Sequence, residues 1–221
     1  TKYMTPVIIL SDGYIANGSE PWKLPKKEDI KPFPTTFRTD PEGYQVYARD
    51  EKTLARDWVK PGTPGLAHRV GGLEKDALTG NVSYDPHNHE TMCHTRAAKV
   101  MAVQDSMGDL LVNGPDQGDL LMVGWGSTYG AITKATNLMQ DEGYSVSSCH
   151  LRWIHPLHPK LGALLKRFKK VVVAEMNLGQ LVKVLRAEYL VDCEPLCKVQ
   201  GKPFKVIEIC NKITERAGKV S

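Results

Sequence analysis

The fold of this chain is decided by the stretch Gly118-Asp119-Leu120-Leu121-Met122-Val123-Gly124-Trp125-Gly126-Ser127-Thr128. An apolar run of strand length that ends in small residues is typical of a buried strand leading directly into a helix. The pattern then repeats, with a helix up to Gly143, a strand over Tyr144–Leu151, a second helix and a strand over Lys170–Ala174. The two helices are marked by apolar residues at helical spacing: Ala131, Ala135, Leu138 and Met139, then Leu161, Leu164, Leu165 and Phe168. This order predicts a parallel sheet with right-handed crossovers.

The residues after this core continue the alternation. A helix follows Gln180, a short strand is expected over Leu196–Gln200, and a last helix runs from Pro203 to Gly218. Their inner faces carry Leu181, Leu185, Tyr189, Val206, Ile209, Cys210, Ile213 and Ala217. We therefore predict an α/β fold, a small mostly parallel sheet with helices on both faces. The loops Gly124–Thr128 and Glu175–Gln180 follow strands, so they should share the carboxyl edge of the sheet.

The first part of the chain has a different character. Residues 6–12 form an apolar run of strand length, and the chain does not open with Met. We expect residues 1–20 to be the last strand of a truncated preceding domain, and 21–66 to be a Pro-rich linker and extended segment. The α/β domain is expected over 67–221. Within it, Asp85-Pro86 should cap a helix that reaches about Met107, with Met92, Val100, Val103 and Met107 facing inward.

Composition argues for an ordinary globular protein. The chain has 221 residues, 41% hydrophobic and 24% charged, with a formal net charge of +4. Basic residues form no stripe with interleaved aromatic residues, which argues against nucleic-acid binding. We see no signal peptide and no apolar run near the roughly 18 residues that span a membrane. The five cysteines, an odd number without a dense framework, favour a reducing, cytoplasmic setting.

Gly124–Thr128 also resembles a phosphate cradle, because free backbone N–H groups at a helix N-terminus can hold an anion. Tyr129 stands where the dinucleotide fingerprint requires Gly, and the second strand ends at Arg152 rather than at an acidic residue. NAD is therefore excluded, whereas an NADP site with Arg152 on the phosphate stays open. The competing interpretation is that small residues here let the helix pack close to the sheet.

The sequence gives only weak evidence for a metal site or a catalytic nucleophile. His89 and Cys93 share a helical face and lie close to His87 and His94, but no second cluster supplies further ligands. Cys193 and Cys197 lack the usual pair spacing, so we predict no metal site. The chain has no Gly-x-Ser-x-Gly elbow, and we predict no catalytic residue. His155 and His158 lie in a Pro-bounded loop, and we expect a surface or interface role for them.

The third strand ends at polar residues with two possible roles. Glu175 and Asn177 follow a buried run, and Gln180 lies in the first turn of the next helix. They bind a ligand or partner, or Asn177 caps that helix. Because an uncompensated buried carboxylate is costly, Glu175 should be paired or partly exposed.

Five motifs in order resemble the alpha subunit of 2-oxoacid:ferredoxin oxidoreductases, most closely the 2-oxoglutarate members. They are Val7–Asp12, Arg69–Asp76 followed by Gly80, Asp85-Pro86 with His89, Arg96 and Lys99, Gly124–Ser127, and Glu175–Leu181. The resemblance covers nearly the whole chain. Many members have a histidine where this chain has Lys75, which puts any role of that histidine here in question.

The resemblance implies a thiamine-pyrimidine-binding domain that ends near residue 20, followed by a transketolase C-terminal-like domain. A beta subunit would supply thiamine pyrophosphate and magnesium binding and an iron–sulfur cluster. The complex would decarboxylate a 2-oxoacid oxidatively, form an acyl-CoA from coenzyme A and reduce ferredoxin. The family's catalytic and substrate residues would lie upstream of Thr1, so no cofactor is expected in this piece.

The role expected for this chain is therefore assembly with a beta subunit in an oligomer and shaping of a shared active site. Two alternatives stay open: a stand-alone NADP- or nucleotide-binding module, and a transketolase or 2-oxoacid dehydrogenase C-terminal domain. The binding or interface candidates are Glu74, Lys75, His89, Arg96, Gly124, Gly126, Ser127, Glu175, Asn177 and Gln180.

Overall fold

The computed structural model describes residues 1–30, 32–33 and 35–219. They form two compact units: Thr1–Ile8 with Pro21–Met107, and Ile9–Glu20 with Gly108–Ser221. The domain boundary predicted after residue 66 lies inside the first of these two units. The division of the protein into domains stays a prediction. None of the helices in the described residues is long and apolar enough to cross a membrane.

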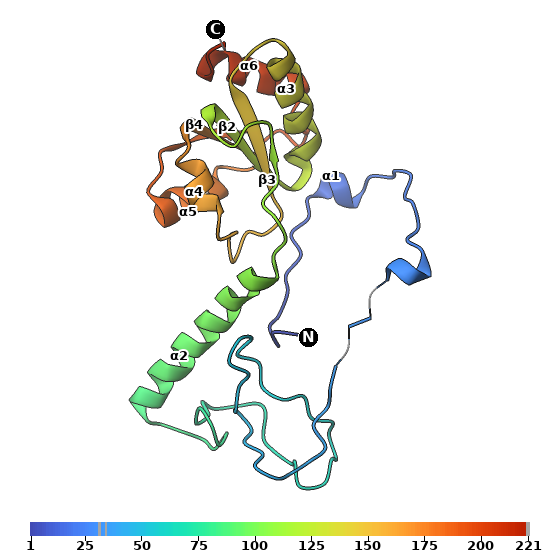
Figure 1. The fold of residues 1–221 in the computed structure, drawn as a ribbon, viewed down its shortest axis with the longest axis vertical. Helices are drawn as coiled ribbons and strands as arrows, with labels where there is room; N and C mark the ends of the chain where they lie inside the picture. Colours follow the sequence, from blue (N-terminus) through green and yellow to red (C-terminus); the bar gives the residue numbers. More distant parts are fainter. Residues whose placement is uncertain (31, 34, 220–221) are drawn as a thin grey trace. The chain divides into compact units, whose positions relative to one another are not determined.

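The second unit is built on a five-stranded sheet with the order β1-β3-β2-β4-β5 (Figure 1). Its strands are β1 (Val112–Asn113), β2 (Gly118–Trp125), β3 (Val146–Leu151), β4 (Phe168–Glu175) and β5 (Cys193–Cys197). β2 pairs in parallel with β3 and β4, and β4 with β5, while only the short β1 is antiparallel to its neighbour. The prediction of a small mostly parallel sheet is therefore confirmed.

Helices cover both faces of this sheet, as expected. They are α3 (Tyr129–Asp141), α4 (Leu161–Leu165), α5 (Gln180–Tyr189) and α6 (Val206–Arg216), with α4 and α5 on one face and α3 and α6 on the other (Figure 1). Successive residues of a strand point to opposite faces. Accordingly, Leu121 packs in the cluster with Leu165 and Leu185, whereas Met122 packs in the cluster with Ile209.

Several element boundaries differ from the prediction, most clearly those of β4 and β5. Phe168 was expected on a helix face, but α4 ends at Leu165 and Phe168 opens β4 opposite Gly118. The pairing of β4 with β2, together with burial of the Phe168 ring in the core, outweighs the helical spacing. The last strand is Cys193–Cys197 and not Leu196–Gln200. Its residues pair with Val171 to Glu175 of β4, and this pairing sets where the strand begins and ends.

The strand predicted over Pro6–Asp12 is not formed. These residues have no strand assignment, and Val7, Ile8 and Ile9 are between 78% and 87% exposed. A strand needs a partner for its backbone N–H and C=O groups, and the described residues offer none to this segment. Instead, Asp12 caps the short helix α1 (Gly13–Ala16) by accepting hydrogen bonds from the N–H groups of Tyr14 and Ile15.

The first unit is mostly irregular. It contains the 3₁₀ turn η1 (Lys27–Asp29) and the helix α2 (Pro86–Met101), which continues as the 3₁₀ turn η2 (Ala102–Ser106). Asp85 caps α2 as predicted, accepting a hydrogen bond from the N–H of His87. Of the four side chains expected to face inward, only Met92 is buried.

Candidate functional site

The corner after β2 is shaped by close packing. Trp125 ends the strand, and Gly126–Thr128 forms the 3₁₀ turn η3 that leads into α3. A Cβ on Gly124 would lie 2.3 Å from Ile132 Cδ1 and 2.5 Å from Thr128 Oγ1, so no side chain fits there. Gly126 has a φ of 58°, a left-handed conformation that favours glycine. Both glycines therefore have a packing or backbone reason of their own.

The donors of this corner already hold a carboxylate. Asp12 pairs with Ser127 at this corner, and the side-chain hydrogen bond with Ser127 is the largest cause that holds the pKa of Asp12 below its ordinary value. The Ser127 hydroxyl also lies 3.3 Å from Met176 Sδ. Thr128 uses its hydroxyl locally, because Oγ1 accepts from the N–H of Trp125 at 3.0 Å and donates to its C=O at 2.8 Å. In this structure Ser127 of the predicted phosphate cradle therefore faces Asp12, and a nucleotide site at this corner stays a prediction.

Glu175, at the end of β4, is fully buried. Its carboxylate accepts hydrogen bonds from the N–H groups of Leu181 (2.8 Å) and Val182 (2.9 Å) in the first turn of α5, and from Asn177 Nδ2 (3.1 Å). A helix N-terminus stabilises negative charge and has N–H groups without intrahelical partners. The expectation that Glu175 is paired is met by backbone and amide donors rather than by a cation.

Asn177 supports the same turn. Its Oδ1 accepts from the N–H of Gly179 at 2.7 Å and from that of Gln180 at 3.3 Å, which is the capping role, one of the two roles predicted from the sequence. Gln180 is exposed, and the neighbouring Leu178 side chain is 77% exposed. Of the loop's candidate side chains, Gln180 is therefore free to meet a partner.

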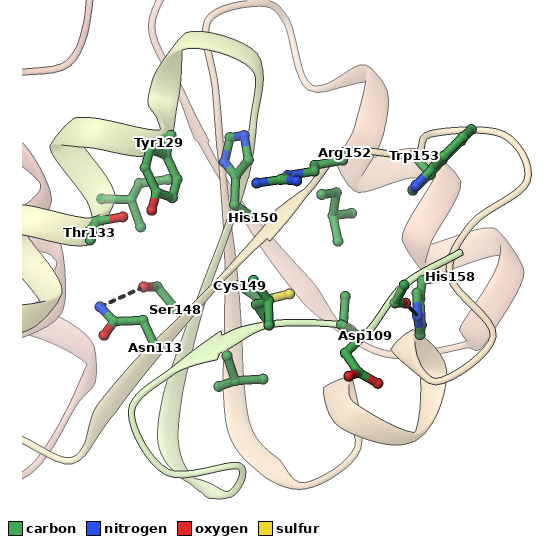
Figure 2. A pocket seen from close by; sticks show the side chains of 16 residues that line it. Asp109, Asn113, Tyr129, Thr133, Ser148, Cys149, His150, Arg152, Trp153 and His158 are labelled. Atoms are coloured by element: carbon green, nitrogen blue, oxygen red, sulfur yellow. Dashed lines mark hydrogen bonds between the residues drawn. The ribbon is translucent and has the colours of Figure 1, made fainter. Parts of the chain in front are cut away.

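A pocket of about 680 Å³ lies beside this sheet, between the segment before β1, β3 and the start of α3 (Figure 2). The ring centroids of His150 and Tyr129 lie 5.0 Å apart. The buried Nδ1 of His150 has no hydrogen-bond partner in the described structure. Burial, and then the nearby Arg152, lower the pKa of His150. Arg152, considered above as a possible phosphate ligand, lines this pocket. The pocket itself could not be predicted from the sequence, because the loop that closes it is distant in sequence.

A surface or interface role was expected for the two histidines of the following loop; His155 is exposed, whereas the surface expectation is wrong for His158. His158 is buried, and its ring nitrogens contact the C=O of Gly108 (2.9 Å) and the N–H of Lys160 (3.1 Å). It also lines the pocket of Figure 2. In this structure His158 therefore ties its loop to Gly108.

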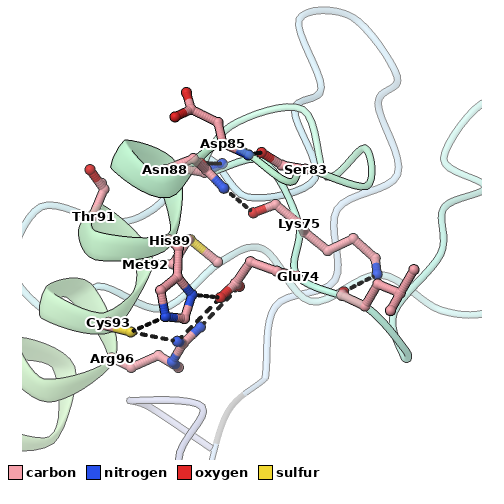
Figure 3. Close-up of polar contacts among 12 residues, drawn as sticks. Glu74, Lys75, Ser83, Asp85, Asn88, His89, Thr91, Met92, Cys93 and Arg96 are labelled. Carbon is pink, nitrogen blue, oxygen red and sulfur yellow. Dashed lines mark hydrogen bonds and ion pairs between the residues drawn. The ribbon is translucent and has the colours of Figure 1, made fainter.

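The first unit brings three of the candidate residues together (Figure 3). From α2, His89 Nδ1 lies 2.8 Å from Glu74 Oε2, and Arg96 contacts both Glu74 oxygens at 3.1 and 3.4 Å. The Arg96 hydrogen bonds, followed by the His89 bond, hold the pKa of Glu74 below its ordinary value. Cys93 Sγ completes the group, 3.2 Å from Arg96 Nη2.

Lys75 behaves differently from its neighbour Glu74. It is only 3% exposed, and its ammonium donates to the C=O of Leu73 instead of joining the Glu74 cluster (Figure 3). Its backbone bridges to Val82, and its C=O accepts from Asn88 Nδ2 at 2.8 Å. Lys75 thus helps to hold this loop against α2.

No group of three or more His, Cys, Asp or Glu side chains in the described residues is placed to hold a metal ion. His89 and Cys93 do approach each other, at 3.5 Å between Nε2 and Sγ. The remaining places around them are taken by Arg96 and Glu74, which form an ion pair at 3.1 Å. The absence of a metal in the whole protein stays a prediction.

Comparison with known proteins shows which protein family this chain resembles. The chain is 48% identical, over 209 residues and 94% of its length, to the 2-oxoglutarate oxidoreductase subunit KorA of Mycobacterium tuberculosis. It is 27% identical over 96% of its length to the alpha subunit of 2-oxoacid:ferredoxin oxidoreductase 2 of Aeropyrum pernix. The chain matches part of the alpha subunits of 2-oxoacid:ferredoxin oxidoreductases. No family model matches it.

The structure agrees with this assignment to the alpha subunits. A 2-oxoglutarate:ferredoxin oxidoreductase from Magnetococcus marinus, solved with 2-oxoglutarate, coenzyme A and succinyl-CoA bound, superposes with a TM-score of 0.79 and 31% identity. The match covers 86% of this chain and 34% of that one. The chain likewise spans 32% and 34% of the two curated alpha subunits named above. The resemblance stated from the sequence motifs is confirmed.

Proposed function

We propose that this chain is part of the alpha subunit of a 2-oxoglutarate:ferredoxin oxidoreductase. The whole complex would decarboxylate 2-oxoglutarate oxidatively, form the acyl-CoA and reduce ferredoxin. The observation that carries this proposal is the 48% identity to a 2-oxoglutarate oxidoreductase subunit over 94% of the chain. The matching fold of the Magnetococcus marinus enzyme supports it independently.

Within that complex the chain serves assembly and active-site shaping. Its conspicuous acidic groups already work inside the fold: Asp12 fills the corner after β2, Glu175 caps α5, and Glu74 holds His89 and Arg96. The exposed Leu178 and Gln180, at the carboxyl edge of the sheet, are the side chains that we assign to contact a partner subunit.

The cofactors belong to other parts of the complex. Thiamine pyrophosphate, magnesium, an iron–sulfur cluster and coenzyme A are implied for the whole enzyme, with a beta subunit and ferredoxin as partners in an oligomer. The cysteines here do not fit a cluster, because Cys149 and Cys193 are buried, and burial raises their pKa to about 12 and about 11. All five cysteines are free thiols, which supports a cytoplasmic location.

Gel filtration of the full-length subunit with its beta subunit tests the assembly role. We expect Gln180→Ala and Leu178→Ala to weaken complex formation, because these side chains are exposed and make no side-chain hydrogen bond in the described structure. Glu188→Ala, on an exposed position nearer the other end of α5, is the matched control. Normal assembly of both edge variants would rule out this surface.

The rival function, a nucleotide-binding module, has a separate readout. A titration of the 221-residue chain with NADP should show no binding at the corner after β2, so Ser127→Ala should leave any NADP affinity unchanged, because Ser127 is paired with Asp12. The chain alone should also fail to reduce a viologen dye with 2-oxoglutarate, since we assign the thiamine pyrophosphate and the iron–sulfur cluster to other parts of the complex. Saturable NADP binding that Ser127→Ala weakens, or dye reduction by the isolated chain, would contradict the proposal.

A further inference from the structure

A second pocket, of about 370 Å³, lies entirely within the first unit. Its size falls in the range of small-molecule sites. The charged side chains that line it are Arg49, Arg56, Lys75, Arg96, Lys99 and Glu74. Five cations and one carboxylate therefore meet around one concave space, although the chain as a whole is only mildly basic.

The single carboxylate does not balance these charges. Glu74 is already held by both Arg96 and His89. No Asp or Glu of the described residues forms an ion pair with Arg49, Arg56 or Lys99. Their polar contacts are to groups other than carboxylates: Arg49 donates to the C=O of Leu54 (3.1 Å), Lys99 donates to that of Met4 (3.2 Å), and Arg56 lies 3.2 Å from His68 Nε2.

The cations also disturb one another. Burial, and then repulsion by Arg56 and Arg96 among other groups, lower the pKa of Arg49. Burial, followed by the charges of Arg49 and Arg56, lowers the pKa of Lys99. Partly buried like charges without a counter-charge cost free energy. An anion in the pocket would remove that cost.

The two central guanidinium groups are held in place before any ligand arrives. Arg49 and Arg56 each lie over the Tyr47 ring, with 5.5 Å between the guanidinium carbon and the ring centroid. Such stacking, together with the Arg49 hydrogen bond, limits side-chain freedom. Donors fixed in advance lose less entropy when a ligand binds.

We propose that this pocket binds the phosphate group of a small molecule. Two guanidinium groups and one ammonium group, from the segment 49–56 and from α2, surround the space. A tetrahedral group with two negative charges has acceptor oxygens for donors from several directions, whereas a carboxylate is planar and carries one charge. Arg is suited to phosphate because its planar fork donates two parallel hydrogen bonds.

Calorimetric titration of the 221-residue chain with inorganic phosphate tests this site, with sodium chloride at matched ionic strength as the reference. We expect saturable binding at one site. Arg56→Gln and Lys99→Gln should each weaken it about tenfold, because each removes charge-assisted hydrogen bonds. Lys134→Gln is the matched control, since Lys134 is an exposed cation on α3 in the other unit and its loss should leave phosphate binding unchanged.

Stability measurements exclude a trivial loss of fold. In phosphate-free buffer, Arg56→Gln should melt no lower than the unsubstituted chain, because it removes a repelled cation. Phosphate should raise the melting temperature of the unsubstituted chain by mass action and should protect the backbone amides of residues 49–56 from hydrogen exchange. This last measurement needs no variant, so it tests the site even where a substitution prevents folding.

Four results would overturn the proposal. One is the absence of saturable phosphate binding, and another is equal affinity in Arg56→Gln, Lys99→Gln and the unsubstituted chain. The third is binding of a hexaglutamate peptide that phosphate does not displace, which would make the pocket a docking site for an acidic protein segment. Binding of succinate as tightly as phosphate would also contradict the preference for a tetrahedral dianion.

Discussion

The two units of this chain are stabilised by different kinds of contact. The second unit buries two apolar clusters, one on each face of its sheet, with Leu120, Leu121, Met122 and Val123 of β2 all at 0% exposure. In the described part of the first unit, the buried hydrophobic side chains are Tyr3, Leu66 and Met92. Burial of apolar surface is the main favourable term in folding, so the second unit has much more of it.

In the first unit, local polar contacts stabilise the loops instead of a large apolar core. The same turn occurs twice, at Asp50–Thr53 and at Asp76–Thr79, where one Asp oxygen accepts from two backbone N–H groups and a Thr hydroxyl. Cations lie over aromatic rings, as in Arg38 with Tyr44 and Lys60 with Phe37. Such contacts define loops without a large core. An irregular segment of this kind can therefore gather charges around a pocket.

Limited proteolysis should show the largest difference. Lys23, Lys26 and Lys27 are exposed and lie outside α-helices and strands, whereas residues 118–175 include three paired strands. Trypsin cleaves only where the chain is locally unfolded. We therefore expect cleavage at these lysines to be roughly a thousandfold faster, or more, than cleavage within residues 118–175. Mass spectrometry of early fragments measures it, and first cuts inside 118–175 would break the comparison. Lys31, in the same segment, lies outside the described residues.

Truncation in the core of the second unit should have the largest effect on stability. Leu121→Ala removes a fully buried side chain from the cluster under α4 and α5. It should lower the free energy of unfolding by about 2–5 kcal/mol, as measured by urea denaturation. Leu178→Ala is the control, because that side chain is 77% exposed and should cost less than about 0.5 kcal/mol. Equal losses would refute the core assignment.

Glu175→Ala should come next. The substitution leaves the N–H groups of Leu181 and Val182 without their acceptor at the buried start of α5. We expect a loss of about 1–3 kcal/mol in the free energy of unfolding. Asn177→Ala, which removes a nearby acceptor from the same turn, should cost about 1 kcal/mol. If Glu175→Ala were as stable as the unsubstituted chain but failed to assemble, the carboxylate would be an interface group instead.

A smaller, pH-dependent effect is expected between β5 and α6. Arg216 and Lys212 contact Glu194, with Arg216 Nε 2.7 Å from Oε2, and the pKa of Glu194 falls from its ordinary 4.5 to about 2. Because the unfolded state binds this proton more readily, the stabilisation is present above about pH 4.5 and is lost as pH falls towards 2. The free energy of unfolding of Glu194→Gln, measured by urea denaturation, should therefore be lower than that of the unsubstituted chain at pH 7 and should match it near pH 2.

The smallest effect is expected in the first unit, for Asp76→Ala. Its carboxylate accepts from the N–H groups of Leu78 and Thr79 and from the Thr79 hydroxyl. Loss of these bonds should speed amide hydrogen exchange at Leu78 and Thr79 while leaving the unfolding of the second unit unchanged. Asp105→Ala, at an exposed position of η2, is the control. A lower melting temperature of the second unit would contradict its independence from this turn.

Sequence patterns alone determined the sheet and its helices. Apolar runs of strand length, helical spacing and glycine stops are local properties, and the order of strands and helices leaves few topologies. The family resemblance also came from the sequence, since its motifs are short and ordered. The capping of α2 by Asp85 was predictable because a cap depends on residues two or three positions away.

Contacts between distant residues were decided only by the tertiary structure. Phe168 joined a strand because β2 lay beside it, and residues 6–12 stayed unpaired because no described strand did. The pairing of Asp12 with Ser127 and the meeting of Arg49 and Arg56 with Lys99 around one pocket join residues far apart in the chain. Local sequence specifies which backbone hydrogen bonds are favourable nearby, whereas the partners of a side chain depend on which segments the whole fold brings together.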